Sequence, residues 1–179
     1  MRGENISLVP SPQKEEKTSG SEESCWYVNF DGLCEPRNPG GVATYGLLIR
    51  KGREVVLRDS GLGFARPWSD EASNNVAEYS AVIKALEWLK EKGHESECVY
   101  LKGDSRLVIN QLSGKFKIKA PRLVELHQRA VELLSDFKDA HLEWVDRSQN
   151  AEADLLSRVA YSRFLKSETR SKESRRSAV

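Results

Sequence analysis

Residues 25–61, CWYVNFDGLCEPRNPGGVATYGLLIRKGREVVLRDSG, predict three consecutive β-strands. From Trp26 to Phe30, large apolar side chains alternate with more polar ones, which is the period of a strand with one buried face. The next two apolar runs, residues 42–50 and 53–61, flank the pair Lys51-Gly52, which suits a hairpin turn. The ordered part of the chain is therefore expected to begin with three antiparallel strands.

Helices and strands alternate in the rest of the chain. An amphipathic helix is predicted over residues 74–93, with Gly93 as its stop. The further predicted elements are a buried strand over 97–104, a short helix over 105–114, a connector over 115–121, a helix over 121–137, a strand over 141–145 and a last helix over 150–165. A meander followed by this alternation predicts an α/β fold with a five-stranded mixed sheet, three antiparallel strands and then parallel ones, flanked by helices.

Charge is distributed unevenly along the 179 residues, although the formal net charge is only +1. Residues 1–24 carry about −2, and residues 158–179 carry about +5 from seven basic and two acidic side chains. The first segment is rich in Ser, Glu, Pro and Lys and cannot bury enough apolar surface to offset its ordering entropy. We predict a disordered segment at 1–24, one domain at 25–165 and a basic, flexible tail at 166–179.

The three cysteines, Cys25, Cys34 and Cys98, form no CxxC pair, and the sequence starts without a recognisable secretory leader. Their odd number favours reduced thiols and a cytoplasmic protein. No run approaches 18 apolar residues, so neither a transmembrane helix nor a membrane partner is expected.

Four acidic residues fall where strands end or helices begin. Asp31 is placed at the end of the first strand and Asp104 at the end of the fourth, while Glu78 and Asp154 lie near the starts of helices. The carboxyl ends of strands in an open α/β sheet form the crevice where ligands bind. Four carboxylates meeting there would repel one another unless cations lay between them, and hard oxygen ligands suit Mg²⁺ or Mn²⁺. Spacing alone does not establish such a site, because the chain contains 27 acidic residues.

The sequences around these acids resemble the successive motifs of ribonuclease H, type 1. The motifs are DGLCEPRNPGG, NNVAEY, KGDSRLVINQ and RSQNAEADLLSR, and the resemblance runs from about Cys25 to about Ala160. It implies the ribonuclease H-like fold and hydrolysis of the RNA strand of RNA–DNA hybrids, leaving 5′-phosphate and 3′-hydroxyl ends. It also implies a two-metal-ion mechanism with Mg²⁺, for which Mn²⁺ substitutes. The catalytic, metal-binding carboxylates of the family fall on Asp31, Glu78, Asp104 and Asp154.

The resemblance also implies residues that contact the substrate. Asn74 and Asn75 match positions that contact the minor groove, Asn38 and Ser73 match a phosphate-holding pocket, and Cys34 matches a position beside the 2′-hydroxyls. Ordinary structural roles are open as well. Ser73 or Asn74 can be the N-cap of the helix, with Asn75 a first-turn residue, and Cys34 can be a half-buried thiol without chemistry.

Asn150 and Arg158 lie four residues before and four residues after Asp154, on one helical face. Asn150 matches a polar family residue near the site, but it can equally be a helix-start amide. Arg158 can pair with Asp154 or approach a phosphate. The remaining acids near the motifs are expected to be solvated or to act as caps: Asp70, Glu71, Asp146 and Glu152.

The chain departs from the family pattern in two places. Where many members have a basic, Trp-containing protrusion, this sequence has only SGKFKIKAP, in which Lys115, Lys117 and Lys119 could face the substrate together or be a solvated connector. The interval from Val145 to Asp154 contains no histidine, although many members have one there. In both respects the sequence resembles short members of the family, including archaeal ones.

Three functions are compatible with these motifs. The first is a monomeric endonuclease for RNA–DNA hybrids. The second keeps the fold but acts on double-stranded RNA or on DNA junctions. The third is a non-catalytic hybrid-binding module, which the four acids argue against, because a pure binder gains nothing from carboxylates that face phosphate.

Overall fold

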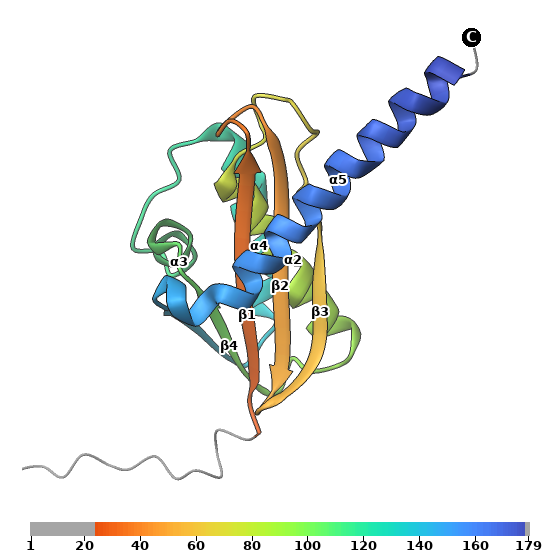
Figure 1. Ribbon diagram of the computed structural model, residues 1–179. Helices are drawn as coiled ribbons and strands as arrows, with labels where there is room; N and C mark the ends of the chain where they lie inside the picture. The colour runs from red at the N-terminus through yellow and green to blue at the C-terminus, as the bar shows by residue number, and fades with distance from the viewer. Residues whose placement is uncertain (1–23, 178–179) are drawn as a thin grey trace, which may run out of the picture.

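A computed structural model describes residues 24–177 and contains one five-stranded sheet with the order β3-β2-β1-β4-β5 (Figure 1). The strands are β1 (Trp26–Glu35), β2 (Val42–Lys51), β3 (Glu54–Leu62), β4 (Cys98–Gly103) and β5 (Asp139–Trp144). The helices are α2 (Asn74–Glu91), α3 (Arg106–Leu112), α4 (Val124–Ser135) and α5 (Ala151–Ser177), with short 3-10 turns η1 (Pro121–Leu123) and η2 (Arg147–Asn150). Residues 1–24 were predicted to be disordered. Except for Ser24, they lie outside the described residues.

The strand pairing confirms the predicted mixed sheet. β1 pairs with β2 and β2 with β3 in antiparallel fashion, whereas β1–β4 and β4–β5 are parallel pairs. The turn between β2 and β3 contains Gly52 at a φ of 56°, in the left-handed region that glycine adopts most readily. The predicted hairpin at Lys51-Gly52 is therefore confirmed.

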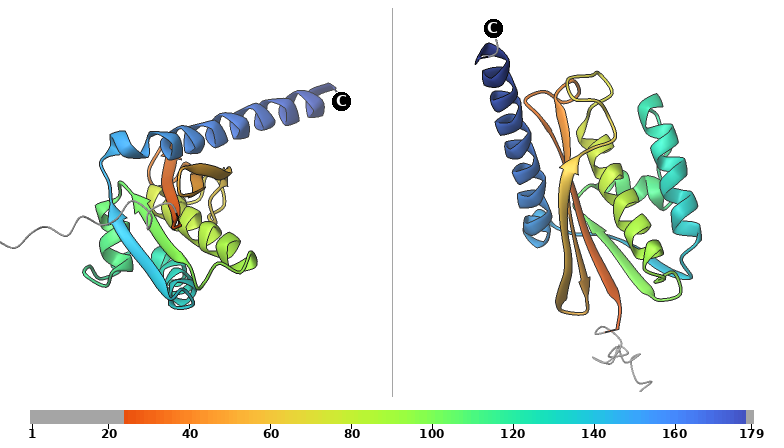
Figure 2. Two further views of the ribbon diagram at one scale, coloured as in Figure 1. Left: turned by 90° about the horizontal axis from the view of Figure 1, so that it is seen from below. Right: turned by 90° about the vertical axis from the view of Figure 1, so that its right-hand side faces the viewer.

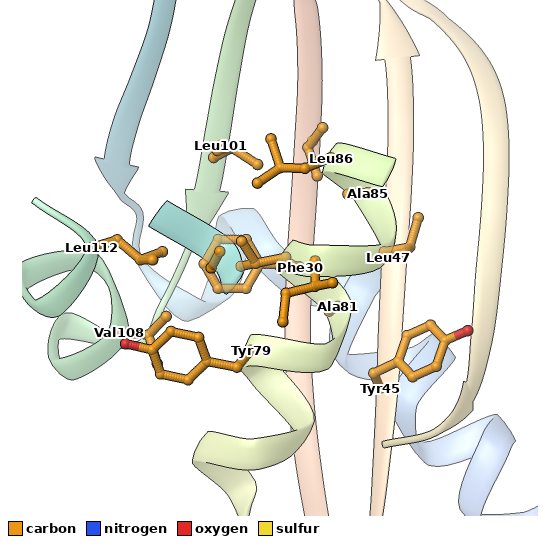
Figure 3. Packing of buried hydrophobic residues seen from close by; sticks show 14 of the residues in the cluster. Phe30, Tyr45, Leu47, Tyr79, Ala81, Ala85, Leu86, Leu101, Val108 and Leu112 are labelled. Carbon is orange, nitrogen blue, oxygen red and sulfur yellow. The ribbon is translucent and has the colours of Figure 1, made fainter. Parts of the chain in front are cut away.

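Helices cover both faces of the sheet. α2, α3 and α4 lie on one face, and α5 crosses the other over β1, β2 and β3 (Figure 2). The main core lies between the sheet and α2, where Phe30, Leu47, Tyr79, Leu86 and Leu101 are buried (Figure 3). Burial of each such side chain stabilises the fold by about 1.5–3 kcal/mol. The apolar stripe of α2 therefore determines which side of this helix packs against the sheet.

Two glycines let helices approach the sheet closely. A Cβ atom on Gly32 of β1 would lie 2.4 Å from the backbone nitrogen of Glu78, and one on Gly46 of β2 would lie 2.2 Å from the carbonyl oxygen of Ala153. Any other residue would force α2 or α5 away from the strands. Because Gly46 lies opposite Asp31 in the β1–β2 register, these contacts bring both helices to the strand that carries Asp31.

Some element boundaries differ from the prediction. Asp31 lies inside β1 rather than at its end, because β1 pairs with β2 as far as Glu35. The parallel pairing with β4 does stop just before Asp31, at Phe30↔Gly103. The helix predicted over 121–137 begins as the 3-10 turn η1, and η2 likewise precedes α5, so Asn150 lies before the α-helix instead of within it.

The C-terminal segment is a continuation of α5. Residues 166–177, where a flexible tail is expected from the sequence, extend this helix beyond the sheet (Figure 1). Residues 151–177 contain neither glycine nor proline and many good helix formers, so nothing ends the helix earlier. Despite its length, α5 is too polar to cross a membrane, and no other helix within residues 24–177 is long and apolar enough to do so.

Cys25 and Cys98 form a disulfide, so the expectation that all three cysteines are reduced is wrong for this pair. The cause is the parallel register of β1 and β4. Trp26 lies opposite Val99, and the preceding residues on each strand are therefore neighbours, with a Cα–Cα distance of 4.8 Å. Cys34 is a free, buried thiol.

Candidate active site

The four predicted carboxylates line one pocket of about 190 Å³. Asp31 comes from β1, Glu78 from the second turn of α2, Asp104 from the residue after β4, and Asp154 from the first turn of α5. The pocket is completed by Gly32, Leu33, Asn74, Ser105, Arg147 and Arg158. The fold therefore brings together four acids that are far apart in the sequence.

Asp31 is held at the floor of the pocket, where its side chain is nearly buried. Its Oδ2 atom accepts a hydrogen bond of 2.6 Å from the hydroxyl of Ser157 on α5. Burial raises the pKa of Asp31 to about 6, and the nearby charges of Asp104 and Asp154 act in the same direction. This carboxylate lies in a site that disfavours its negative charge.

Glu78 is the least satisfied of the four acids. Its Oε2 atom is buried and finds no hydrogen-bond donor within residues 24–177. Burial raises the pKa of Glu78 to about 8, the hydrogen bond from Ser105 opposes this shift, and the charges of Asp31 and Asp104 add to it. An orphaned carboxylate oxygen facing two other acids is the arrangement expected where a cation belongs.

Asp104 is oriented by a buried amide, Asn150. The Nδ2 atom of Asn150 donates to Asp104 Oδ1 at 3.1 Å and to the carbonyl oxygen of Phe30 at 2.9 Å. Its Oδ1 atom accepts a hydrogen bond of 3.2 Å from Asn29. Asn150 is only 1% exposed, so it cannot be a simple surface amide at a helix start. It ties β1, the end of β4 and the start of α5 into one network.

Asp154 differs from the other acids because it has two cationic partners. Arg158 donates to it through Nε (2.9 Å) and Nη2 (3.2 Å), and Arg147 donates through Nη2 (2.9 Å). These hydrogen bonds, that of Arg158 first, lower the pKa of Asp154. Of the two roles considered for Arg158, the structure contains the ion pair with Asp154.

The oxygen set of this pocket fits a hard divalent cation. Three of the four carboxylates lack a cationic partner in the hydrogen bonds and ion pairs of the described residues, and two of them have raised pKa values. Carboxylate oxygens without sulfur or imidazole suit Mg²⁺ or Mn²⁺ better than Zn²⁺. Asp31, Glu78, Asp104 and Asp154 are the residues that could hold it.

Replacement of Glu78 by Gln should stabilise the metal-free protein. The carboxyl pKa is raised from 4.5 to about 8, so the folded wild type loses stability as pH rises between these values, and the neutral amide avoids this loss. With chelator present, the melting temperature of Glu78→Gln should exceed that of wild type by a margin that grows from pH 5 to pH 8. A constant or absent difference would contradict the unsatisfied carboxylate. Hybrid cleavage by the variant should be lost.

The start of α2 contains both capping residues and amides that line the neighbouring pockets. Ser73 is the N-cap and accepts a hydrogen bond of 3.3 Å from the Val76 N–H, while Asn38 Oδ1 accepts one of 3.0 Å from the Asn74 N–H. Asn74 lines the acidic pocket, and its Oδ1 atom is buried without a donor within residues 24–177. Asn75 makes none of these capping bonds, so it is free to serve another role.

Asn75 and the three predicted lysines line a second, larger pocket of about 600 Å³. Its walls come from α2, α3 and the irregular segment between α3 and η1, and they include Gln111, Phe116, Lys115, Lys117 and Lys119. Ile118 packs against the core. The structure therefore gathers Asn75 and the lysines at one surface beside the acidic pocket.

The Cys34 thiol does not line either pocket. It is 4% exposed and donates to the carbonyl oxygens of Arg37 (3.0 Å) and Ala72 (3.4 Å), which joins the loop after β1 to the residues before α2. Among the acids expected to be caps or solvated, Asp146 caps η2 and Glu152 pairs with Arg50 and Arg58.

Four polar or charged residues that support the four acids were missed from the sequence: Asn29, Ser105, Arg147 and Ser157. Arg147 carried a signal, since it is the basic residue in the interval where the family histidine is absent. Asn29 and Ser157 carried none, because only the packing of α5 on β1 shows that they support Asn150 and Asp31.

Comparisons with known proteins agree with this geometry. A family model described as reverse transcriptase-like matches residues 29–160. Ribonuclease HI of Halobacterium salinarum is 37% identical over 134 residues, which are 75% of this chain and 63% of that protein. The bifunctional protein Rv2228c of Mycobacterium tuberculosis is 37% identical over 124 residues, 69% of this chain, but the match spans only 32% of that longer relative.

Solved structures show the same fold. The RNase H1 of H. salinarum superposes with a TM-score of 0.67 at 32% identity, covering 78% of this chain and 98% of that one. LC11-RNase H1 in complex with an RNA/DNA hybrid gives 0.68 at 28% identity, covering 78% and 99%. Fold and carboxylate pocket together define a ribonuclease H-like protein. The chain belongs to the reverse transcriptase-like family and is homologous to ribonuclease HI.

Proposed function

We propose that this protein is an endonuclease that hydrolyses the RNA strand of RNA–DNA hybrids and leaves 5′-phosphate and 3′-hydroxyl ends. The observation that carries this proposal is the single pocket lined by four carboxylates, in which Glu78 Oε2 is buried without a donor among residues 24–177. The four acids would hold two Mg²⁺ ions, or Mn²⁺ in their place. Bound there, the ions would supply an activated water and compensation for charge on the leaving oxygen.

The surrounding side chains have separate tasks in this mechanism. Asn150 and Ser157 fix the orientation of Asp104 and Asp31 through hydrogen bonds of 3.1 and 2.6 Å. Arg147 and Arg158 hold Asp154 and keep it ionised. Their guanidinium groups line the pocket and place positive charge where a substrate phosphate would enter.

Substrate recognition would use the surface beside the acids. Asn74 and Asn75 would contact the minor groove, and Asn38 and Ser73 would border a phosphate. Lys115, Lys117 and Lys119 would contact the backbone from the second pocket. Because Cys34 is buried, we propose that it shapes the loop by which the 2′-hydroxyls would pass. Recognition of hydroxyls, backbone and groove shape predicts little sequence preference.

Asn75→Ala should weaken discrimination of a hybrid from duplex DNA with little loss of stability. Ser73, not Asn75, caps α2, so Ser73→Ala is the matched control and should cost about 0.5–2 kcal/mol of stability. Competition binding with both duplexes and thermal melting measure the two effects. If Asn75→Ala lowers the melting temperature as much as Ser73→Ala and leaves discrimination intact, Asn75 has only a structural role.

Deletion of residues 167–179 should weaken hybrid binding through lost charge. The deletion removes Arg170, Lys172, Arg175 and Arg176 against Glu168 and Glu173, a net loss of two positive charges. We expect a raised KM, a nearly unchanged kcat and a shallower slope of log affinity against log salt. Equal slopes and affinities for full-length and truncated protein would show that the end of α5 does not contact the substrate.

One substrate panel tests the proposed function. RNA–DNA hybrid, double-stranded RNA and double-stranded DNA are incubated with Mg²⁺ or Mn²⁺, with and without chelator. The proposal requires metal-dependent cleavage of the hybrid and no cleavage of double-stranded DNA. Cleavage of double-stranded RNA alone would favour a nuclease of the same fold that acts on double-stranded RNA. Tight hybrid binding without cleavage would favour a non-catalytic hybrid-binding module.

A further inference from the structure

Four side chains of types that can bind metals lie in a row at the end of the sheet opposite the acidic pocket. This row consists of Cys25, Cys98, Asp139 and His141. Cys25 precedes β1 and is joined to Cys98, the first residue of β4, and Cys98 lies opposite Asp139, the first residue of β5. His141 lies two residues further along β5, on the same face as Asp139. Ligand atoms of Cys98, Asp139 and His141 all lie within 4.8 Å of one another.

This row lies on an accessible part of the sheet. Asp139 and His141 are exposed and Cys98 is partly exposed, because α5 packs over β1, β2 and β3 on that face. The ring of His141 stacks on Tyr100 at 4.6 Å, and its Nε2 atom lies 2.8 Å from Asp139 Oδ1. The imidazole is thereby held beside both the carboxylate and the sulfur.

We propose that, when the disulfide is reduced, Cys25, Cys98, Asp139 and His141 form a tetrahedral Zn²⁺ site. Two thiolates, an imidazole and a carboxylate are ligands that zinc prefers, and zinc bonds of about 2.0–2.3 Å place ligand atoms about 3.3–3.8 Å apart. The separations of up to 4.8 Å among three of the groups would have to shorten by about 1 Å to reach this range. The fourth ligand, Cys25, is bonded to Cys98 but is buried and lies outside this group, so its thiolate would have to turn toward Asp139 and His141.

The site and the disulfide exclude each other, so zinc binding would depend on redox state. A dithiol reductant supplies two electrons and two protons. The Sγ–Sγ bond of Cys25 and Cys98 breaks, two thiols form, and the reductant becomes a disulfide. Zinc then binds the two thiolates and releases two protons. Oxidation of the cysteines by a disulfide would reverse these steps and release the ion.

The site is distinct from the acidic pocket in position and chemistry. Cys98 and Asp104 are six residues apart along β4, which corresponds to about 20 Å of strand. The acidic pocket offers only oxygen ligands, whereas this row offers sulfur and nitrogen as well, so the two sites should select different metals. A simpler explanation of the same residues is an Asp139–His141 ion pair beside a purely structural disulfide.

Cobalt titration of the full-length protein separates these explanations. Co²⁺ replaces Zn²⁺ in tetrahedral sites and gives intense d–d bands and a thiolate charge-transfer band. The metal-free protein is reduced with a phosphine and titrated with Co²⁺ and then Zn²⁺, all in a Cys34→Ser, Asp104→Asn background. This background removes the third thiol and weakens cobalt binding by the acidic pocket.

The reduced protein should bind one equivalent of Co²⁺ with both kinds of band, and Zn²⁺ should abolish them. The oxidised protein should show neither. His141→Ala should lower affinity by more than the roughly ten- to hundredfold loss caused by removal of an outer-shell partner. Glu143→Gln, which alters the next exposed carboxylate on the same face of β5, is the matched control and should bind like the parent. Absence of the bands in the reduced protein, or their persistence in His141→Ala, would overturn the proposal.

Discussion

Asp104→Asn should lower the rate of hybrid cleavage by orders of magnitude and leave the fold intact. The substitution removes the charge of a proposed metal ligand but keeps the shape of the side chain. The Asn150 amide can still donate to the remaining oxygen, as it does to Asp104 Oδ1 at 3.1 Å. Loss of a direct ligand should exceed the roughly ten- to hundredfold loss caused by removal of an outer-shell partner. Single-turnover cleavage in Mg²⁺ measures the effect.

The melting temperature of Asp104→Asn is the second quantity to measure. Asp104 contributes to the repulsion that raises the pKa values of Asp31 and Glu78, so its neutralisation should preserve or raise the melting temperature in chelator. Asp70→Asn makes the same chemical change at an exposed acid outside the pocket and should leave both cleavage and stability unchanged. Wild-type-like cleavage by Asp104→Asn would refute the assignment of the metal site.

Asn150→Ala should be the most destabilising of the substitutions considered for the site. It removes the buried donor to the Phe30 carbonyl and the nearer acceptor of the Asn29 amide, which keeps only a 3.5 Å contact to the Gln149 carbonyl oxygen. Each such loss costs about 1–3 kcal/mol, so a total of about 2–6 kcal/mol is expected. For a chain of this size, that corresponds to a fall in melting temperature of roughly 4–24 °C.

The same substitution should also slow cleavage by the protein that remains folded, because Asp104 loses the donor that orients it. Cleavage is measured well below the melting temperature of the variant, so that unfolding does not contribute. Gln128→Ala removes an exposed amide on α4 and is the control, for which neither change is expected. If Asn150→Ala melts like Gln128→Ala, the buried network does not stabilise the fold. Unchanged cleavage would show that Asp104 needs no positioning.

Local patterns in the sequence were sufficient to predict most of the fold. Alternation in residues 26–30 and the apolar stripe of α2 each report a buried face directly. The disulfide could not be predicted, because it depends on the parallel register between β1 and β4, two strands separated by more than 60 residues. For a different reason, the helical form of residues 166–177 was not predicted. The charged and serine-rich composition of this segment resembles disorder, yet the segment continues an established helix without a residue that would stop it.

The candidate active site also contains residues that the sequence could predict and residues that it could not. The four acids could be predicted because each belongs to a sequence motif. Their supporting residues could not, because Asn29 bonds to Asn150 and Ser157 bonds to Asp31 only through the close packing of α5 on the sheet, which Gly46 permits. The raised pKa of Glu78 likewise depends on the folded state. It comes first from burial and then from the charges of Asp31 and Asp104, which only the fold brings near.

The proposed function requires that the four carboxylates hold metal ions when the protein hydrolyses the RNA strand of a hybrid. The most direct test measures the cleavage rate of a labelled hybrid against free Mg²⁺ and identifies the chemistry of the new RNA ends. We predict no cleavage in chelator, a rate that rises with Mg²⁺ and saturates, and products with 5′-phosphate and 3′-hydroxyl ends. Cleavage that persists in chelator would contradict this account, because the reaction would then need no metal ion. Products that end in a 2′,3′-cyclic phosphate would also contradict it, because the RNA would then be cut by its own 2′-hydroxyl instead of by a metal-activated water.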